Sequence, residues 1–117
     1  THWLKEVAPQ AGDYKVVNTA QDRFFCTDLD KILKDKGIKT LILVGWKISG
    51  SVTYTSVAAM AHGYTVVIPM DTTSAGSPYE TTIGFYNVLN SGNANLANEP
   101  MKARAVTLTR TNLVAFQ

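Results

Sequence analysis

The chain has 117 residues, of which 45% are hydrophobic, and eleven basic against nine acidic side chains leave a net charge of +2 at pH 7. This length allows one domain with a small core, and the small basic excess argues against a nucleic-acid-binding protein. The single cysteine, Cys26, and two histidines far apart in the sequence predict no disulfide, no metal site and no cofactor, and no apolar run is long enough to predict a membrane span.

The first predicted elements lie in the N-terminal half of the chain. Residues 14–17 form a short apolar stretch that fits a strand. Residues 27–36 carry apolar side chains at helical spacing, with Thr27 as the expected N-cap and Gly37 as the residue that ends the helix. Residues 40–45 are a continuous apolar run ended by glycine, which is typical of a strand buried on both faces of a parallel sheet.

The remaining elements alternate in the same way. The turn 49–51 opens a second predicted helix, which Gly63 ends. The elements that follow are, in order, a second buried strand (64–69), a polar loop (71–78), a third helix (79–89), an irregular excursion (90–100) and a last strand (105–109). Alternating strands and helices at this spacing predict right-handed crossovers and a parallel sheet.

Sites in such sheets form at the carboxyl ends of the strands, which directs attention to the segment after Gly45. Ser51 lies there, at the predicted start of the second helix. Unpaired backbone N–H groups at a helix start favour an anion or a developing oxyanion, so a nucleophile at this place would have its charge stabilised. On the residues alone, the simpler interpretation is that Ser49 or Ser51 is an N-cap and Gly50 a turn residue.

A set of motifs in fixed order resembles the isochorismatase-like cysteine hydrolases. The motifs are Phe24-x-x-Thr27-Asp28-Leu29, Gly37-Ile38, Thr40-Leu41-Ile42-Leu43-x-Gly45, Ser51-Val52-x-x-Thr55, Ala59, Gly63-Tyr64 and Asp71. They span about residues 13–75, and their combination is specific although each piece is not. The resemblance implies a three-layer, Rossmann-like α/β fold with helices on both faces of a parallel sheet. It also implies a family that hydrolyses amides, or in isochorismatase itself a vinyl ether, with an aspartate–lysine–cysteine triad.

Carrying the family residues over shows three departures. Ser51 stands at the cysteine position, Asn18 stands at the lysine position, and the first strand, which bears the aspartate, has no counterpart in this chain. The backbone amides of the family's oxyanion site map onto Lys47 and Ser51, and its cis peptide bond maps onto Trp46–Lys47. The resemblance therefore implies that residues 1–117 are the C-terminal portion of a single domain.

Without the first strand, a parallel strand edge would be bare and apolar, which promotes aggregation. We therefore expect an N-terminal companion segment or chain that covers it. Family members are often dimers or tetramers, so the resemblance also implies self-association.

The chemistry argues against the family mechanism at Ser51. A serine hydroxyl is far less acidic than a thiol and needs an adjacent base held by a third group. Asn18 cannot accept a proton, and His62 follows Ser51 by eleven residues, roughly 16 Å along a helix. We expect a protein that has lost the amidase mechanism and binds a small molecule or serves a structural role.

Two alternatives stay open. The first is an active hydrolase of small amides or esters that uses Ser51 or a bound water. The second is that serine was introduced in place of a cysteine to trap a substrate, which the simultaneous change at Asn18 argues against because one change would suffice.

Four further residues are candidates for the lining of the pocket. Trp46, Phe24 and Tyr54 either contact a ligand or belong to the core, where aromatic side chains near strand ends usually lie. Asp71 either faces the pocket or holds its own loop, and the turn-rich sequence around it favours the loop.

Overall fold

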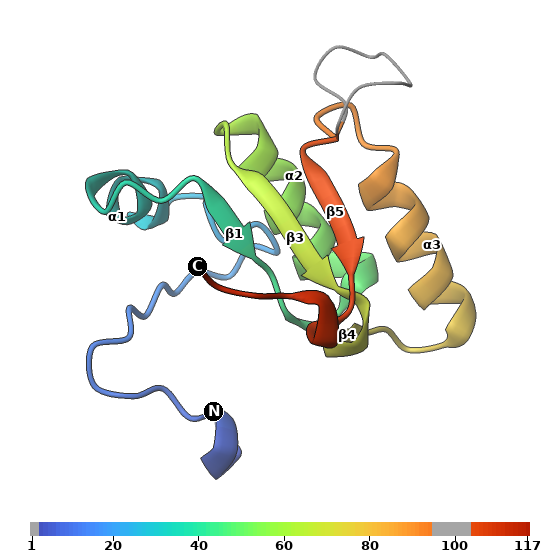
Figure 1. Ribbon diagram of the computed structural model, residues 1–117, viewed down its shortest axis with the longest axis horizontal. Helices are drawn as coiled ribbons and strands as arrows, with labels where there is room; N and C mark the ends of the chain where they lie inside the picture. The colour runs from blue at the N-terminus through green and yellow to red at the C-terminus, as the bar shows by residue number, and fades with distance from the viewer. Residues whose placement is uncertain (1–2, 95–103) are drawn as a thin grey trace.

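Three parallel strands form the main sheet of the protein (Figure 1). The computed structural model describes residues 3–94 and 104–117. The strands lie in the order β1 (Thr40–Ile42), β3 (Thr65–Pro69) and β5 (Val106–Thr109). Helices α2 (Thr53–Ala61) and α3 (Pro78–Leu89) supply the crossovers between them, so the strands run in the same direction. The predicted α/β class with a parallel sheet is confirmed.

The core lies between the sheet and the helices α2 and α3, which cover the same face of the sheet (Figure 1). Side chains alternate along a strand, so Val66 and Ile68 of β3 point into this core and are fully buried. Val88 of α3 and Ile48, just before α2, are fully buried with them. The strongly apolar β3 is the middle strand of the three, and the side chains that it turns to the core are buried, as predicted for this segment.

The opposite face of the sheet is more open. Ile42, Val67 and Thr107 lie on it, and the C-terminal segment 113–116 crosses it, so that strands and segment enclose a hollow of about 420 Å³. β1 is the outer strand of the sheet, and Ile42 is 37% exposed. The prediction that this strand is buried on both faces is wrong for the described residues, because Ile42 lies on the open face of the sheet. No described strand pairs with the outer edge of β1.

The apolar run 40–45 does not form one strand. β1 ends at Ile42, and a second short strand, β2 (Gly45–Trp46), pairs with β4 (Thr73–Ser74) in a separate two-stranded sheet. Gly45 allows the change of direction because its φ of 123° is open to glycine and not to other residues. This break turns the chain from the main sheet toward the candidate site.

The first helix, α1 (Leu29–Asp35), begins two residues later than predicted. Thr27 still serves its start, since its hydroxyl oxygen accepts a hydrogen bond from the Leu29 N–H at 3.4 Å. Gly37 ends the helix as predicted: its φ is +67°, and its N–H donates to the Lys34 carbonyl at 2.9 Å.

Two other predictions need comment. Residues 14–17 form no strand, because no described segment pairs with them, so that prediction is wrong. The predicted excursion at 90–100 begins as a turn at 91–94, and its remaining residues lie outside the described part. No helix among the described residues is long and apolar enough to cross a membrane.

Candidate functional site

Ser51 lies in a π-helical turn, Ile48–Val52, which joins β2 to α2. The Lys47 carbonyl closes the turn by accepting hydrogen bonds from the Gly50 and Val52 N–H groups, at 3.0 and 3.2 Å. Ser51 is half-buried here and lines a pocket, not the packed interior. The predicted location between a strand and a helix, next to a cavity, agrees with this structure.

Helix α3 supports the turn from behind. Gly84 of α3 lies so close to it that a Cβ atom at this position would be 2.9 Å from both the Ile48 carbonyl carbon and the Ser49 nitrogen. Thr53 adds a hydrogen bond to the Ile48 carbonyl. The position of Ser51 is therefore determined by backbone packed against backbone.

The pocket has a volume of about 260 Å³. Its walls combine an apolar side with a polar one, formed by Leu43, Val44, Trp46, Val52, Arg23, Ser51 and Thr55. No aspartate, glutamate, histidine or lysine is among the described residues that line it. The pocket can therefore hold a small molecule against hydroxyl groups and a cation, but its own walls lack a group to take the serine proton.

The peptide bond between Trp46 and Lys47 is cis, as the resemblance predicted. Trp46 lines the pocket and is 68% exposed. The Lys47 ammonium lies 5.6 Å from the Trp46 ring centroid and 3.5 Å from a carboxylate oxygen of Glu80. The side chain of Lys47 is thus paired outside the pocket, and the role of its backbone amide in binding an oxyanion stays a prediction.

Asn18 organises the loop that forms one wall of the pocket. Its side-chain nitrogen donates to the carbonyls of Asp22 and Phe25, both at 2.8 Å. Its side-chain and backbone oxygens accept from Nη1 of Arg23, at 2.9 and 3.2 Å. Asn18 is not itself among the pocket-lining residues, but it holds Arg23, which is.

Arg23 is the charged residue among the described pocket-lining residues that the sequence analysis missed. Its backbone N–H donates to the Thr55 hydroxyl at 3.2 Å, and that hydroxyl donates to the Gln21 carbonyl at 3.1 Å. These bonds attach the loop to α2, next to Ser51. The sequence does show an arginine between the family's lysine position and Phe24. Its side chain could not be assigned to a pocket without knowing how the loop folds.

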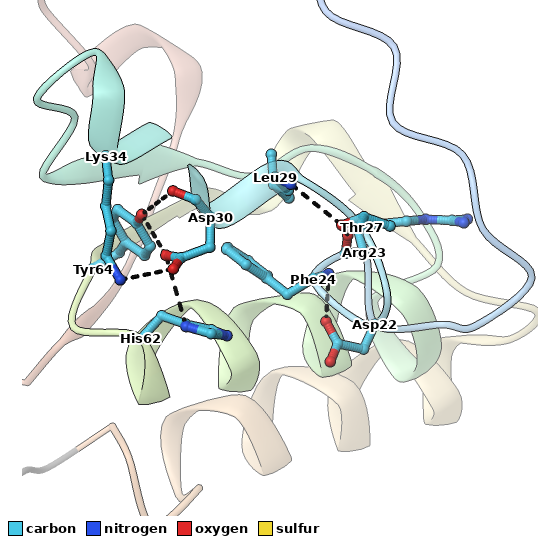
Figure 2. A network of polar contacts seen from close by, with 9 residues as sticks. All are labelled: Asp22, Arg23, Phe24, Thr27, Leu29, Asp30, Lys34, His62 and Tyr64. Carbon is cyan, nitrogen blue, oxygen red and sulfur yellow. Dashed lines mark hydrogen bonds and ion pairs between the residues drawn. The ribbon is translucent and has the colours of Figure 1, made fainter. Parts of the chain in front are cut away.

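Phe24 does not line the Ser51 pocket. It is buried in the core, with its ring centroid 4.9 Å from that of His62 and 5.9 Å from that of Tyr64 (Figure 2). Tyr54 is also absent from the pocket and lies exposed beside Phe25 in a neighbouring surface hollow. Of the three aromatic candidates, the structure places Trp46 alone beside Ser51.

Asp71 connects two segments of the chain outside the pocket. Its carboxylate accepts hydrogen bonds from the Thr111 N–H at 2.9 Å and from the Thr111 hydroxyl at 2.5 Å. These bonds hold the pKa of Asp71 below its ordinary value. Asp71 thus attaches the segment after β5 to the one after β3, which is the loop-holding role named as its alternative.

A polar cluster behind Phe24 attaches α1 to the end of α2 (Figure 2). The Tyr64 hydroxyl donates to Asp30 at 2.8 Å, and Lys34 pairs with the same carboxylate at 2.7 Å. Hydrogen bonds from Lys34 and Tyr64 lower the pKa of Asp30, whereas burial together with Asp30 raises the pKa of Tyr64 to about 12. The cluster thus attaches α1 to the segment between α2 and β3.

In residues 3–94 and 104–117, no three histidine, cysteine, aspartate or glutamate side chains come close enough to hold a metal ion.

Comparison with known proteins finds one family model. The model of the isochorismatase domain matches residues 1–99. A maleamate amidohydrolase of Pseudomonas putida is 36% identical over 66 residues, which are 56% of this chain and 31% of that protein. A probable inactive nicotinamidase of Arabidopsis thaliana is 31% identical over 81 residues, which are 68% of this chain and 41% of that protein.

Among solved structures, an isochorismatase-like hydrolase from Alkaliphilus metalliredigens superimposes with a TM-score of 0.72 at 30% identity. The superposition covers 75% of this chain and 48% of that one. The chain spans about a third to a half of the length of the curated relatives it matches.

Proposed function

Because the chain belongs to the isochorismatase domain family, we propose that it binds a small molecule in the Ser51 pocket and has lost the family's aspartate–lysine–cysteine amidase mechanism. The observation that carries this proposal is the composition of the pocket wall. Ser51 borders a cavity of about 260 Å³, yet none of the seven described residues around it can accept a proton near neutral pH.

The position of Asn18 supports the same proposal. A lysine there would offer a group that exchanges protons, whereas the Asn18 amide is fully engaged in holding the loop 22–25 and Arg23. The replacement thus serves the shape of the pocket. A relative whose name describes it as a probable inactive nicotinamidase is consistent with loss of activity on this fold.

The alternative function is hydrolysis of small amides or esters by Ser51 or a bound water. The position of Ser51 favours this alternative, because Ser51 lines the cavity at the start of a helical segment. Such a mechanism needs a base from outside the pocket wall.

A companion polypeptide would be the source of such a base. We propose that the free edge of β1 pairs with a strand of an N-terminal companion segment or chain. The exposure of Ile42 at this edge supports the pairing, as does the greater length of the relatives. Unpaired parallel edges with apolar side chains are otherwise sites of aggregation.

Acylation distinguishes binding from hydrolysis. The purified chain is incubated with an activated ester such as p-nitrophenyl acetate, and its intact mass is compared with that of a Ser51→Ala variant. A binding protein gives equal masses for both. An acetyl adduct that is present in the wild type, absent in the variant and located at Ser51 by peptide mapping would refute the binding-only proposal.

Restoring the two family residues tests how the activity was lost. A variant with Ser51→Cys and Asn18→Lys is assayed for release of ammonia from small amides, with the single variants as controls. Gained turnover in the double variant alone would show that these two changes silenced the site. A double variant that folds but stays inactive would count against the hypothesis that these two positions alone account for the lost activity.

A further inference from the structure

We propose that Arg23 recognises a carboxylate on the ligand of the Ser51 pocket. The inference rests on the proposed function, and it names the ligand class: small molecules in which a carboxylate lies a few atoms from a neutral polar group such as an amide. Arg23 would bind the carboxylate, and the hydroxyl groups of Ser51 and Thr55 would face the neutral end.

The charges around the pocket support this assignment. Arg23 is the charged residue of the described pocket wall. The nearby cation of Lys47 is paired with Glu80. No carboxylate of the described residues forms an ion pair with Arg23. The pocket therefore carries a positive charge that no carboxylate of the described residues pairs with, and a bound anion would compensate it.

The hydrogen bonds that Arg23 makes to Asn18 use one edge of its guanidinium group, and the edge that suits a carboxylate makes no hydrogen bond to the described residues. Both Asn18 oxygens accept from Nη1, which has two N–H groups, so this nitrogen is engaged. The Nη2 and Nε groups remain, and together they present two parallel donors that match the two oxygens of a carboxylate. Figure 2 shows the Arg23 side chain extending away from Phe24 and the Asp30 cluster, so the polar groups there do not compete for it.

The same bonds hold Arg23 in place before a ligand arrives. Asn18 fixes its guanidinium, and the Thr55 hydroxyl accepts from its backbone N–H. Less side-chain entropy is therefore lost on binding than for a free arginine. Asn18 acts here as a positioning residue, which gives the residue at the family's lysine position a role in ligand specificity.

The test compares two probes that share a carbon skeleton. Succinamate carries one carboxylate and one amide, and succinamide carries two amides and no charge. Binding of each to the 117-residue chain is measured by calorimetry, with backbone NMR shifts at Ser51 to locate the site. We expect succinamate to bind about tenfold more tightly than succinamide, because hydrogen bonds to a charged group contribute more than neutral ones. Added salt should weaken the binding of succinamate alone.

Two variants and one control assign the effect. Arg23→Gln should abolish the preference by weakening succinamate binding far more than succinamide binding. Asn18→Asp should also abolish it, because the new carboxylate would pair with the guanidinium. Lys39→Gln removes an exposed positive charge that is not among the pocket-lining residues and should keep the preference.

The outcomes separate this inference from the proposed function. Equal binding of both probes with shifts at Ser51, or a preference that persists in folded Arg23→Gln protein, would overturn the role of Arg23 and leave the binding function standing. Failure of both probes to bind would contradict both proposals.

Discussion

Gly84 offers the sharpest test of how the Ser51 turn is held. In the variant Gly84→Ala, the new Cβ would lie 2.9 Å from two backbone atoms, the Ile48 carbonyl carbon and the Ser49 nitrogen. Such atoms cannot rotate away, so α3 or the turn must shift. Overpacking of this kind costs about 1–3 kcal/mol, and the better helix propensity of alanine returns about 1 kcal/mol. We expect a net loss of up to about 2 kcal/mol in the free energy of unfolding.

Urea and thermal denaturation measure this loss, and the expected decrease in Tm is up to about 8 °C for a domain of this size. NMR shifts of the Ser49 and Ser51 amides should move in the same variant. Gly92→Ala is the matched control, because no atom lies within 4 Å of a Cβ built there, and it should change the stability by less than about 0.5 kcal/mol. Unchanged stability and unchanged Ser51 shifts in Gly84→Ala would refute the argument that α3 positions the turn.

Three further predictions concern the supports of the fold. The pKa of Tyr64 is raised to about 12, so its contribution to stability is complete below pH 10 and is lost as the pH rises toward 12. Unfolding curves measured across this pH range should show a loss of stability that the Tyr64→Phe variant lacks. Parallel pH profiles of the two proteins would contradict this prediction. The pKa of Asp71 is lowered by its bonds to Thr111, so its contribution is present above its ordinary pKa of 3.8 and is lost as the pH falls below that value. Asp71→Asn should remove that acid-side loss and speed hydrogen exchange at the Thr111 N–H; unchanged exchange would count against the attachment. Ile42→Lys adds a charge to the free edge of β1 and should reduce self-association measured by light scattering, and equal scattering would argue that the edge is not the contact.

The pattern of apolar residues was sufficient to predict much of the secondary structure. Gly37 ends α1 through a left-handed backbone conformation that glycine adopts readily because it has no Cβ atom. The apolar run at 64–69 likewise predicted a buried strand from neighbouring residues alone. The placement of Ser51 between a strand and a helix also followed from the order of elements along the chain.

The contacts between residues far apart in the sequence could not be predicted in this way. Arg23 reaches the pocket because Thr55, 32 residues later, accepts its backbone N–H, and Asp71 is occupied by Thr111, 40 residues later. Phe24 matches a family motif, yet its ring packs in the core against His62. Whether such a side chain faces a cavity or the interior depends on contacts between distant segments.

The sequence by itself therefore determined the fold class, most of the helices and strands, and the location of Ser51, since backbone preference and hydrophobic periodicity act over a few neighbouring residues. Only the tertiary structure decided that β1 is the outer strand of the described sheet, and that α3 packs on the Ser51 turn through Gly84. It also decided that the described lining of the pocket includes an arginine and no base. These features arise from close packing and hydrogen bonding between segments far apart in the chain, which no local pattern encodes.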